Sequence, residues 1–198
     1  TTLFLSTAAA LTLGALVGSE TLTLSGAGAG ADKNVGVNKP VTLGTLALGD
    51  GTGLASNYTF TGGTQVATIT AANLTIGTAN VTKTYDGGLT AAGTAAVSGG
   101  TLFSGDTLSG GNFAFTDKNA GSGNKTVTTS GVTVNDGNSG GNYSVSYANN
   151  NTSTITPKAL TALVAAPSKT YDGTATAAPT LTITAGLVGS ETVRATGA

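Results

Sequence analysis

Cysteine, methionine, tryptophan and histidine are all missing from this chain of 198 residues. Without histidine or cysteine there is no imidazole base and no thiol nucleophile, so hydrolysis would need paired carboxylates, a Ser/Lys pair or a metal ion. Three acidic residues, Glu20, Asp106 and Glu191, recur at one position of a repeated segment and do not form a convergent pair. We therefore expect a protein that is not an enzyme, with no catalytic residues, no cofactor-binding residues and no cofactor.

Charged residues are scarce as well. They make up 9% of the chain, the net charge is −1, and the eight basic residues are spread along the sequence. A nucleic-acid interface or an anionic membrane surface needs clustered positive charge, so we expect neither partner. No apolar run approaches the roughly 20 residues that cross a bilayer. The apolar residues 2–18 lack the basic start of a signal peptide, and we interpret them as part of a folded domain without membrane insertion.

The residues that are abundant favour β-structure. The chain has 39 threonines and 31 glycines, and 39% of its residues are apolar, which argues against disorder. Threonine and valine favour a pleated, half-buried surface, while Gly, Asn and Asp supply turns. Alternating apolar and polar residues predict strands with one face in a core. These runs are TLTLS (21–25), VATITA (66–71), YSVSYA (143–148), TSTIT (152–156) and LTITA (181–185).

The sequence also repeats itself. The pentapeptide KTYDG at residues 83–87 returns at residues 169–173, which sets a period of 86 residues. A repeat of this length is one structural unit, so the chain is an array. Further blocks return in the same order: LVGSET (16–21 and 187–192) with LFSGDT (102–107) between them, DKNVG (32–36) and DKNAG (117–121), NYTF (57–60) and NYSV (142–145), and ITAANLT (69–75) and ITPKALT (155–161).

The phase of the repeat divides the chain into three parts. Residues 1–72 are a partial repeat lacking its start, residues 73–157 are a complete repeat, and residues 158–198 are a partial repeat lacking most of its end. Because both ends fall inside a repeat, we expect the sequence to come from a longer polypeptide. The predicted fold is all-β, with tandem immunoglobulin-like β-sandwich repeats. A β-grasp-like repeat and a β-solenoid are alternatives. The sequence shows no sub-period near 20 residues, which argues against the solenoid.

The order of the blocks, from KTYDG through LVGSET, DKNVG and GNY to ITPKALT, resembles the YDG-type repeats of large bacterial surface adhesins, including haemagglutinin-like exoproteins. This resemblance implies an extracellular location at the bacterial cell surface and a role as a stalk or spacer that presents a distal adhesive region. A host or surface ligand would then bind elsewhere in the full protein. The low charge and the alternating strands leave a second interpretation open, a self-associating subunit of an extracellular filament or biofilm matrix fibre. In that case other copies of the chain dock through strand edges.

The KTYDG segments supply the candidate motif residues. We interpret Asp-Gly as a tight turn, the tyrosine as a ring packed across a sheet edge with its hydroxyl reaching the backbone, and the lysine as a local partner of the aspartate or a surface residue. A carbohydrate contact by the tyrosine and a covalent lysine crosslink are less favoured alternatives. The eight residues are Lys83, Tyr85, Asp86, Gly87, Lys169, Tyr171, Asp172 and Gly173.

Four aspartates are weak candidates for calcium binding: Asp32, Asp117, Asp50 and Asp136. Calcium takes six to eight oxygen ligands, several of them from carboxylates. The chain has nine acidic residues and no cluster of the DxDxD kind. We therefore expect turns with backbone and lysine partners at these positions, and no metal.

Overall fold

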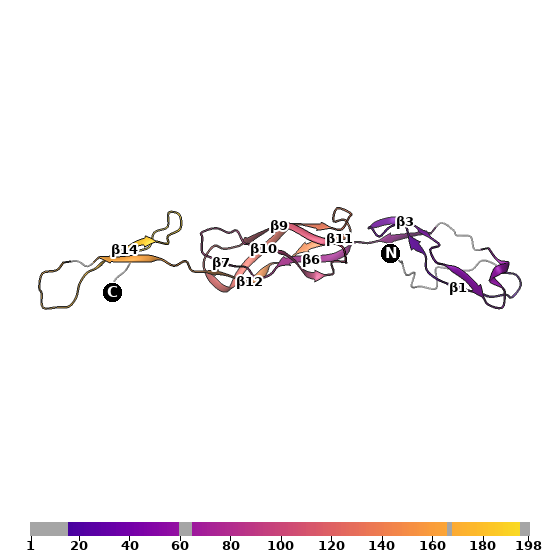
Figure 1. Ribbon diagram of the computed structural model, residues 1–198, viewed down its shortest axis with the longest axis horizontal. Helices are drawn as coiled ribbons and strands as arrows, with labels where there is room; N and C mark the ends of the chain where they lie inside the picture. The colour runs from indigo at the N-terminus through magenta and orange to yellow at the C-terminus, as the bar shows by residue number, and fades with distance from the viewer. Residues whose placement is uncertain (1–15, 60–64, 166–167, 195–198) are drawn as a thin grey trace. The chain divides into compact units, whose positions relative to one another are not determined.

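The computed structural model describes residues 16–59, 65–165 and 168–194 (Figure 1). Residues 1–15, which hold most of the apolar opening segment, lie outside this range. The described residues form strands β1 to β14, one three-residue 3-10 turn and no α-helix, so the prediction of an all-β protein is confirmed. Within them, no helix is long and apolar enough to span a membrane.

The chain divides into two units. The first comprises the described residues up to Ala72 together with Asp136–Ser144, and the second comprises Asn73–Asn135 and the described residues from Val145 onward. In the first unit, β1 pairs with β4 and a second sheet has the order β2-β3-β5. The bounds are β1 (Leu22–Ser25), β2 (Ala29–Gly30), β3 (Gly36–Thr42), β4 (Ala47–Asp50), η1 (Ala55–Asn57) and β5 (Gln65–Ile69).

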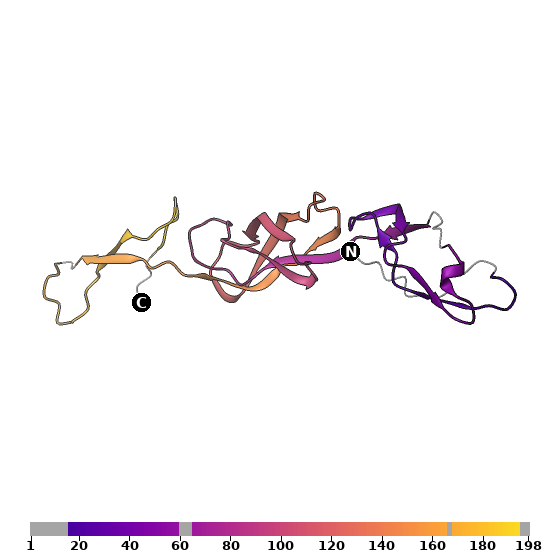
Figure 2. The same ribbon diagram turned by 45° about the vertical axis from the view of Figure 1, so that its right-hand side comes forward.

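The complete repeat is built from two sheets. One has the order β7-β12-β10-β9, with β7 parallel to β12, and the other has the order β11-β6-β8. Figure 2 shows the first sheet curling along the long strand β10. A hairpin of β13 and β14 follows. The bounds are β6 (Ala72–Thr78), β7 (Thr82–Thr84), β8 (Ala95–Gly100), β9 (Thr107–Phe115), β10 (Gly121–Asn135), β11 (Tyr143–Tyr147), β12 (Asn150–Thr156), β13 (Thr161–Ala165) and β14 (Thr180–Ala185).

The five alternating runs are strands, as predicted. They coincide with β1, β5, β11, β12 and β14 within one or two residues at each end. On β12 the burial alternates as expected, because Ser153 and Ile155 are buried while Thr156 is exposed. In β12 the period-two pattern therefore marks a buried and an exposed face. The prediction of one face in a core is wrong for β11 and β14, where Val145 and Leu181 are 37% and 42% exposed.

The core of the complete repeat gathers around Phe115, which is 1% exposed at the end of β9. Val127 on β10 and Ile155 on β12 are equally buried and pack with it. Tyr85 and Phe113 pack against this cluster from its edge. The first KTYDG segment begins inside β7 with Lys83 and Thr84, and Tyr85 directly after the strand packs against the core.

Two antiparallel strand pairs 86 residues apart, β6–β8 and β13–β14, have the same register. Thr75 of β6 lies opposite Gly99 of β8, and Thr161 of β13 lies opposite Ala185 of β14. In both strand pairs the register shifts directly after these residues. A shared bulge at equivalent residues means that the partial third repeat starts with the same local fold as the complete one.

A glycine that the geometry requires stands at the end of the second strand in both pairs. Gly100 and Gly186 have φ angles of 79° and 103°. A Cβ atom there would lie 2.2 Å from the carbonyl oxygen of Asn73 and 2.3 Å from that of Ala159. Only glycine tolerates both the left-handed backbone and this approach.

The sheet of β3 and β5 in the first unit has the same register as the sheet of β10 and β12 in the complete repeat. In β3 and β5, Gly36 lies opposite Ile69, and in β10 and β12, Gly121 lies opposite Ile155. Both pairings are followed by a register shift before the next lysine of the strand. Strand pairing in the first unit therefore repeats strand pairing in the complete repeat.

Candidate functional site

The first KTYDG segment folds into a loop that its own lysine closes. The Nζ atom of Lys83 donates to Asp86 Oδ1 and to the carbonyl of Gly88, both at 2.7 Å. The backbone N–H of Gly88 donates to the same carboxylate oxygen at 2.9 Å. Gly87 has a φ of 76°, which favours glycine. We call this arrangement of lysine, aspartate and following backbone the YDG clasp.

The second KTYDG segment forms the same clasp. Lys169 Nζ lies 2.7 Å from Asp172 Oδ1 and donates to the carbonyl of Thr174 at 2.9 Å. The N–H of Thr174 donates to Asp172 Oδ1 at 2.9 Å, and Gly173 has a φ of 77°. In both copies the hydrogen bonds that close the loop reach no further than seven residues from the lysine, so the local sequence specifies the clasp.

The two tyrosines of these segments are placed differently. The hydroxyl of Tyr85 donates to the Glu191 carboxylate and not to a backbone group, and its ring packs against the Phe115 cluster. Tyr171 is 93% exposed. The lysine of the first clasp also lies over the Phe115 ring, 5.4 Å from its centroid, which adds a cation–π contact.

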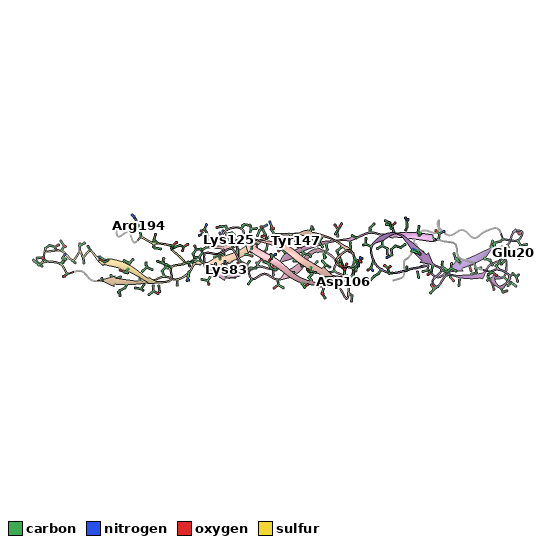
Figure 3. All side chains as sticks on the ribbon, turned by 90° about the horizontal axis from the view of Figure 1, so that it is seen from above. Glu20, Lys83, Asp106, Lys125, Tyr147 and Arg194 are labelled. Carbon is green, nitrogen blue, oxygen red and sulfur yellow. The ribbon has the colours of Figure 1, made fainter. Side chains whose placement is uncertain are left out.

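Two further lysine–aspartate pairs close the DKN segments. Lys39 donates to Asp32, and Lys125 donates to Asp117. Each carboxylate also accepts the backbone N–H two residues later, at 2.7 Å and 2.8 Å respectively. The two lysine side chains are only 13% and 11% exposed. Lys83 and Lys125 are both labelled in Figure 3, on the strands of the complete repeat.

Asp50 and Asp136 occupy equivalent loops but differ in burial. Asp50 is exposed and accepts the N–H of Ala55 at 2.7 Å. Asp136 is 3% exposed, and its carboxylate accepts three backbone N–H groups at 2.7 to 2.9 Å, those of Asn138, Gly140 and Asn142. Asp136 therefore organises its whole loop.

These contacts bear on the calcium candidates. The carboxylates of Asp32 and Asp117 face lysine ammonium groups, and Asp136 faces N–H donors. A cation would have to displace positive charge or donors from each of them. Among the described residues, no group of three or more His, Cys, Asp or Glu side chains is arranged to hold a metal ion.

The same contacts shift the acidities of the aspartates. Lysine hydrogen bonds, supported by backbone N–H groups, lower the pKa of Asp32, Asp86, Asp117 and Asp172. Burial acts in the opposite direction on Asp136, but its three backbone N–H donors outweigh burial and lower its pKa too. The tyrosines shift the other way, because hydrogen bonds to Glu20 and Glu191 raise the pKa of Tyr58 and Tyr85.

We expect the free energy of unfolding to be nearly constant from about pH 5 to pH 8 and to fall below about pH 4. The chain has no histidine, whose side chain would titrate near neutrality. Because the folded state lowers the aspartate pKa values, the stabilisation is complete above the unfolded pKa of about 4 and is lost as the pH falls through the folded values. Urea midpoints at pH 7, 5 and 3 test this expectation, and equal midpoints at pH 7 and pH 3 would contradict it.

A recurring turn, missed in the sequence, completes the site. In each LVGSET-type segment the acidic residue donates its N–H to the carbonyl three residues earlier, at 3.1 to 3.2 Å. The pairs are Glu20 with Val17, Asp106 with Phe103, and Glu191 with Val188. Figure 3 labels Glu20 and Asp106. One turn is therefore built three times, and we call it the acidic turn.

The glycine of the acidic turn moves by one position in the middle copy. Gly18 and Gly189 are the second residues of their turns, with φ angles of 59° and 58°, whereas Gly105 is the third residue, with a φ of 92°. Positive φ at the third residue is typical of type II turns, and at the second residue of the primed types. In the sequence, LVGSET has Gly-Ser where LFSGDT has Ser-Gly. This exchange was the available signal that the middle copy keeps a turn at this place but forms it with a different turn type.

In the first unit a tyrosine also binds the acidic turn. The hydroxyl of Tyr58 accepts the N–H of Val17 at 3.1 Å and donates to the Glu20 carboxylate. The repeat pattern marks the NYTF and LVGSET blocks separately, but it does not show that they meet. The glutamate of this turn thus accepts a tyrosine hydroxyl in both units, from Tyr58 in the first and from Tyr85 in the second.

Comparison with known families gives one match. The sequence model of the family described as YDG domain matches residues 1–67 and, a second time, residues 70–152, which together cover more than half of the chain. The chain matches no curated protein and no solved structure.

Proposed function

Because the chain belongs to the YDG domain family, we propose that it is a structural stalk or spacer segment of a secreted or surface-anchored bacterial adhesin, not an enzyme. In this proposal each repeat is an immunoglobulin-like β-sandwich outside the cell, and the array holds a distal adhesive region away from the surface. The ligand of the full protein binds that distal region.

The observation that carries the proposal is that the recurring charged residues hydrogen-bond within their own loops. The lysines and aspartates of the YDG and DKN segments hydrogen-bond each other and their own loops, in copy after copy. A binding or catalytic module would keep such groups available to a ligand. Side chains that close loops in every repeat fit a part whose work is mechanical.

The experiment is deletion of residues 73–158, one full period of 86 residues, from the native surface protein. A spacer predicts a shorter projection from the cell and unchanged ligand affinity of the purified protein, because one repeat in phase is removed. Loss of ligand binding after this deletion would instead make the repeat a binding module. Stretching the protein in a force spectrometer gives a second readout, since each repeat should unfold with an equal increment of about 300 Å.

Exposed apolar side chains on both faces of the β13–β14 hairpin favour a second candidate function, a self-associating subunit of an extracellular filament or biofilm matrix fibre. Leu163 is 62% exposed, Val164 60% and Leu181 42%. Exposed strands with apolar side chains pair readily with strands of other copies. Sedimentation of the purified chain discriminates the two functions, because a spacer stays monomeric and a filament subunit forms concentration-dependent oligomers.

A further inference from the structure

We propose that the tyrosine of the KTYDG segment is the joint between successive repeats, and that its partner is the acidic turn of the next repeat. The joint consists of Tyr85, Gly87 and Lys118 on one side and the Val188–Glu191 turn on the other. This inference rests on the proposed spacer function for its mechanical meaning, and it assigns a role to the two motifs that the fold of a single repeat does not explain.

Tyr85 is anchored in its own repeat before it reaches the next one. Its backbone N–H donates to the carbonyl of Thr156 at 2.8 Å, and its ring packs against the Phe115 cluster. The hydroxyl donates to the Glu191 carboxylate, which lies 106 residues further along the chain. A ring held at one end by a core and at the other by a charged acceptor has little rotational freedom.

Gly87 and Lys118 add a steric and an electrostatic contact. A Cβ atom on Gly87 would lie 2.9 Å from Val188 Cγ1, so the glycine allows the turn to approach the loop closely. Lys118 Nζ lies 4.0 Å from Glu191 Oε1, the oxygen that the tyrosine hydroxyl also contacts. The carboxylate is therefore shared between a hydroxyl and an ammonium group.

The connection between the repeats is short enough for this joint to control its geometry. Only residues 157–160 separate β12 from β13, and the first of them is Pro157. Proline fixes one backbone angle and removes one donor. Pro157, Leu160, Leu187 and Tyr85 line one cavity of about 280 Å³ at the joint. A small cavity leaves room for bending, and the polar contacts limit it.

The other copies of the motifs separate the clasp from the joint. Tyr171 belongs to a complete YDG clasp and is 93% exposed, so the clasp forms whether or not an acidic turn lies on its tyrosine. Glu20 accepts a hydroxyl from Tyr58, so an acidic turn of this type binds tyrosine in more than one setting. What is specific to the joint is the pairing of Tyr85 with Glu191.

In both units a DKN segment contacts the repeat that follows it. In the second unit Lys118 approaches Glu191. In the first unit Asn142 accepts the N–H of Val35 at 2.9 Å and donates to Asn34 Oδ1 at 3.1 Å. Within each unit the DKN segment of one repeat thus contacts a loop or turn of the following repeat.

The test measures the distance distribution across the joint by pulsed electron paramagnetic resonance. The chain contains no cysteine, so Thr133→Cys on β10 and Thr182→Cys on β14, both exposed, give two spin-labelling sites on the intact chain. Tyr85→Phe removes only the hydroxyl, and Glu191→Gln removes the charge of its acceptor. Because a hydrogen bond to a charged group is worth about a factor of ten or more, each change should lower the ratio of docked to undocked joints about tenfold and broaden the distribution.

Tyr171→Phe is the matched control and should leave the distribution unchanged. The melting temperature of the complete repeat should change little in Tyr85→Phe, since the ring still packs against the Phe115 cluster. The proposal is overturned if Tyr85→Phe and Glu191→Gln leave the distribution as it is, or if Tyr171→Phe broadens it equally. Even if the joints were free, deletion of residues 73–158 would still shorten the projection of the stalk, so failure of the joint and failure of the spacer function are distinguishable.

Discussion

Replacement of Phe115 by alanine is expected to lower the free energy of unfolding of the complete repeat by about 3 to 5 kcal/mol. Phe115 is 1% exposed and is the largest fully buried side chain among the described residues. It packs with Val127 on β10 and Ile155 on β12, so its removal leaves a cavity in the core that these residues share. A small domain has little stability to spare, and such a loss should unfold most of this repeat under mild denaturant.

The measurement is urea unfolding followed by hydrogen exchange of the amides in β9, β10 and β12, because repeats that unfold separately do not share one transition. Tyr171→Ala is the control, since it removes an aromatic ring that is 93% exposed and should change stability little. If both variants lost the same stability, Phe115 would not be the centre of the core.

The strands and the period of this chain were predictable because both follow from patterns among residues that are close in the sequence or identical between copies. Alternation of threonine with apolar residues located β1, β5, β11, β12 and β14. The spacing of KTYDG gave the period, and the pairing of Thr75 with Gly99 returns 86 residues later as that of Thr161 with Ala185. Periodicity and turn chemistry depend on neighbouring residues, so one sequence suffices to see them.

Sheet order and side-chain partners were not predictable in the same way. The strand order β7-β12-β10-β9 needs the parallel pairing of β7 with the last strand of the repeat, for which no local pattern exists. The tyrosine hydroxyl was expected to reach backbone, and that of Tyr85 reaches a glutamate 106 residues away. Recurrence in every period identifies a block as part of the repeat. It does not identify which other block it contacts, because that depends on the order and curvature of the strands in the folded sheets.

Charge pairing lies between these cases. The KTYDG lysines were expected to pair locally with the aspartate or to lie on the surface, and Lys83 and Lys169 both pair with the aspartate three residues later. In the DKN segment Lys125 reaches back eight residues to Asp117, across a register shift at the start of β10. Register shifts of this kind have weak sequence signals, so for this pair the sequence supported only the general expectation of a lysine partner.

Alkaline conditions should weaken the joint because they deprotonate the hydroxyl of Tyr85. Hydrogen bonds to glutamate raise the pKa of Tyr58 and Tyr85, so this stabilisation is complete below the unfolded pKa of about 10 and is lost as the pH rises through the folded values. The spin-label distance distribution at pH 8 and pH 11 reports this loss. A Tyr85→Phe chain serves as control and should show a smaller change between the two pH values.

Asp136→Asn should lower the melting temperature of the chain by at least about 5 °C, a large effect for an isosteric change at one loop. Asp136 is 3% exposed, and both of its carboxylate oxygens accept backbone N–H groups. Asparagine keeps one acceptor and places an NH₂ group against a backbone donor, so at least one buried N–H loses its partner.

The equivalent change Asp50→Asn provides the control, since Asp50 lies 86 residues earlier, is exposed and accepts the N–H of Ala55. It should shift the melting temperature much less. Hydrogen exchange adds a local readout: the amides of Asn138, Gly140 and Asn142 should lose protection in Asp136→Asn, because their acceptor is the carboxylate itself. Retained protection of all three amides would show that the turn backbone, and not the buried charge, holds this loop in place.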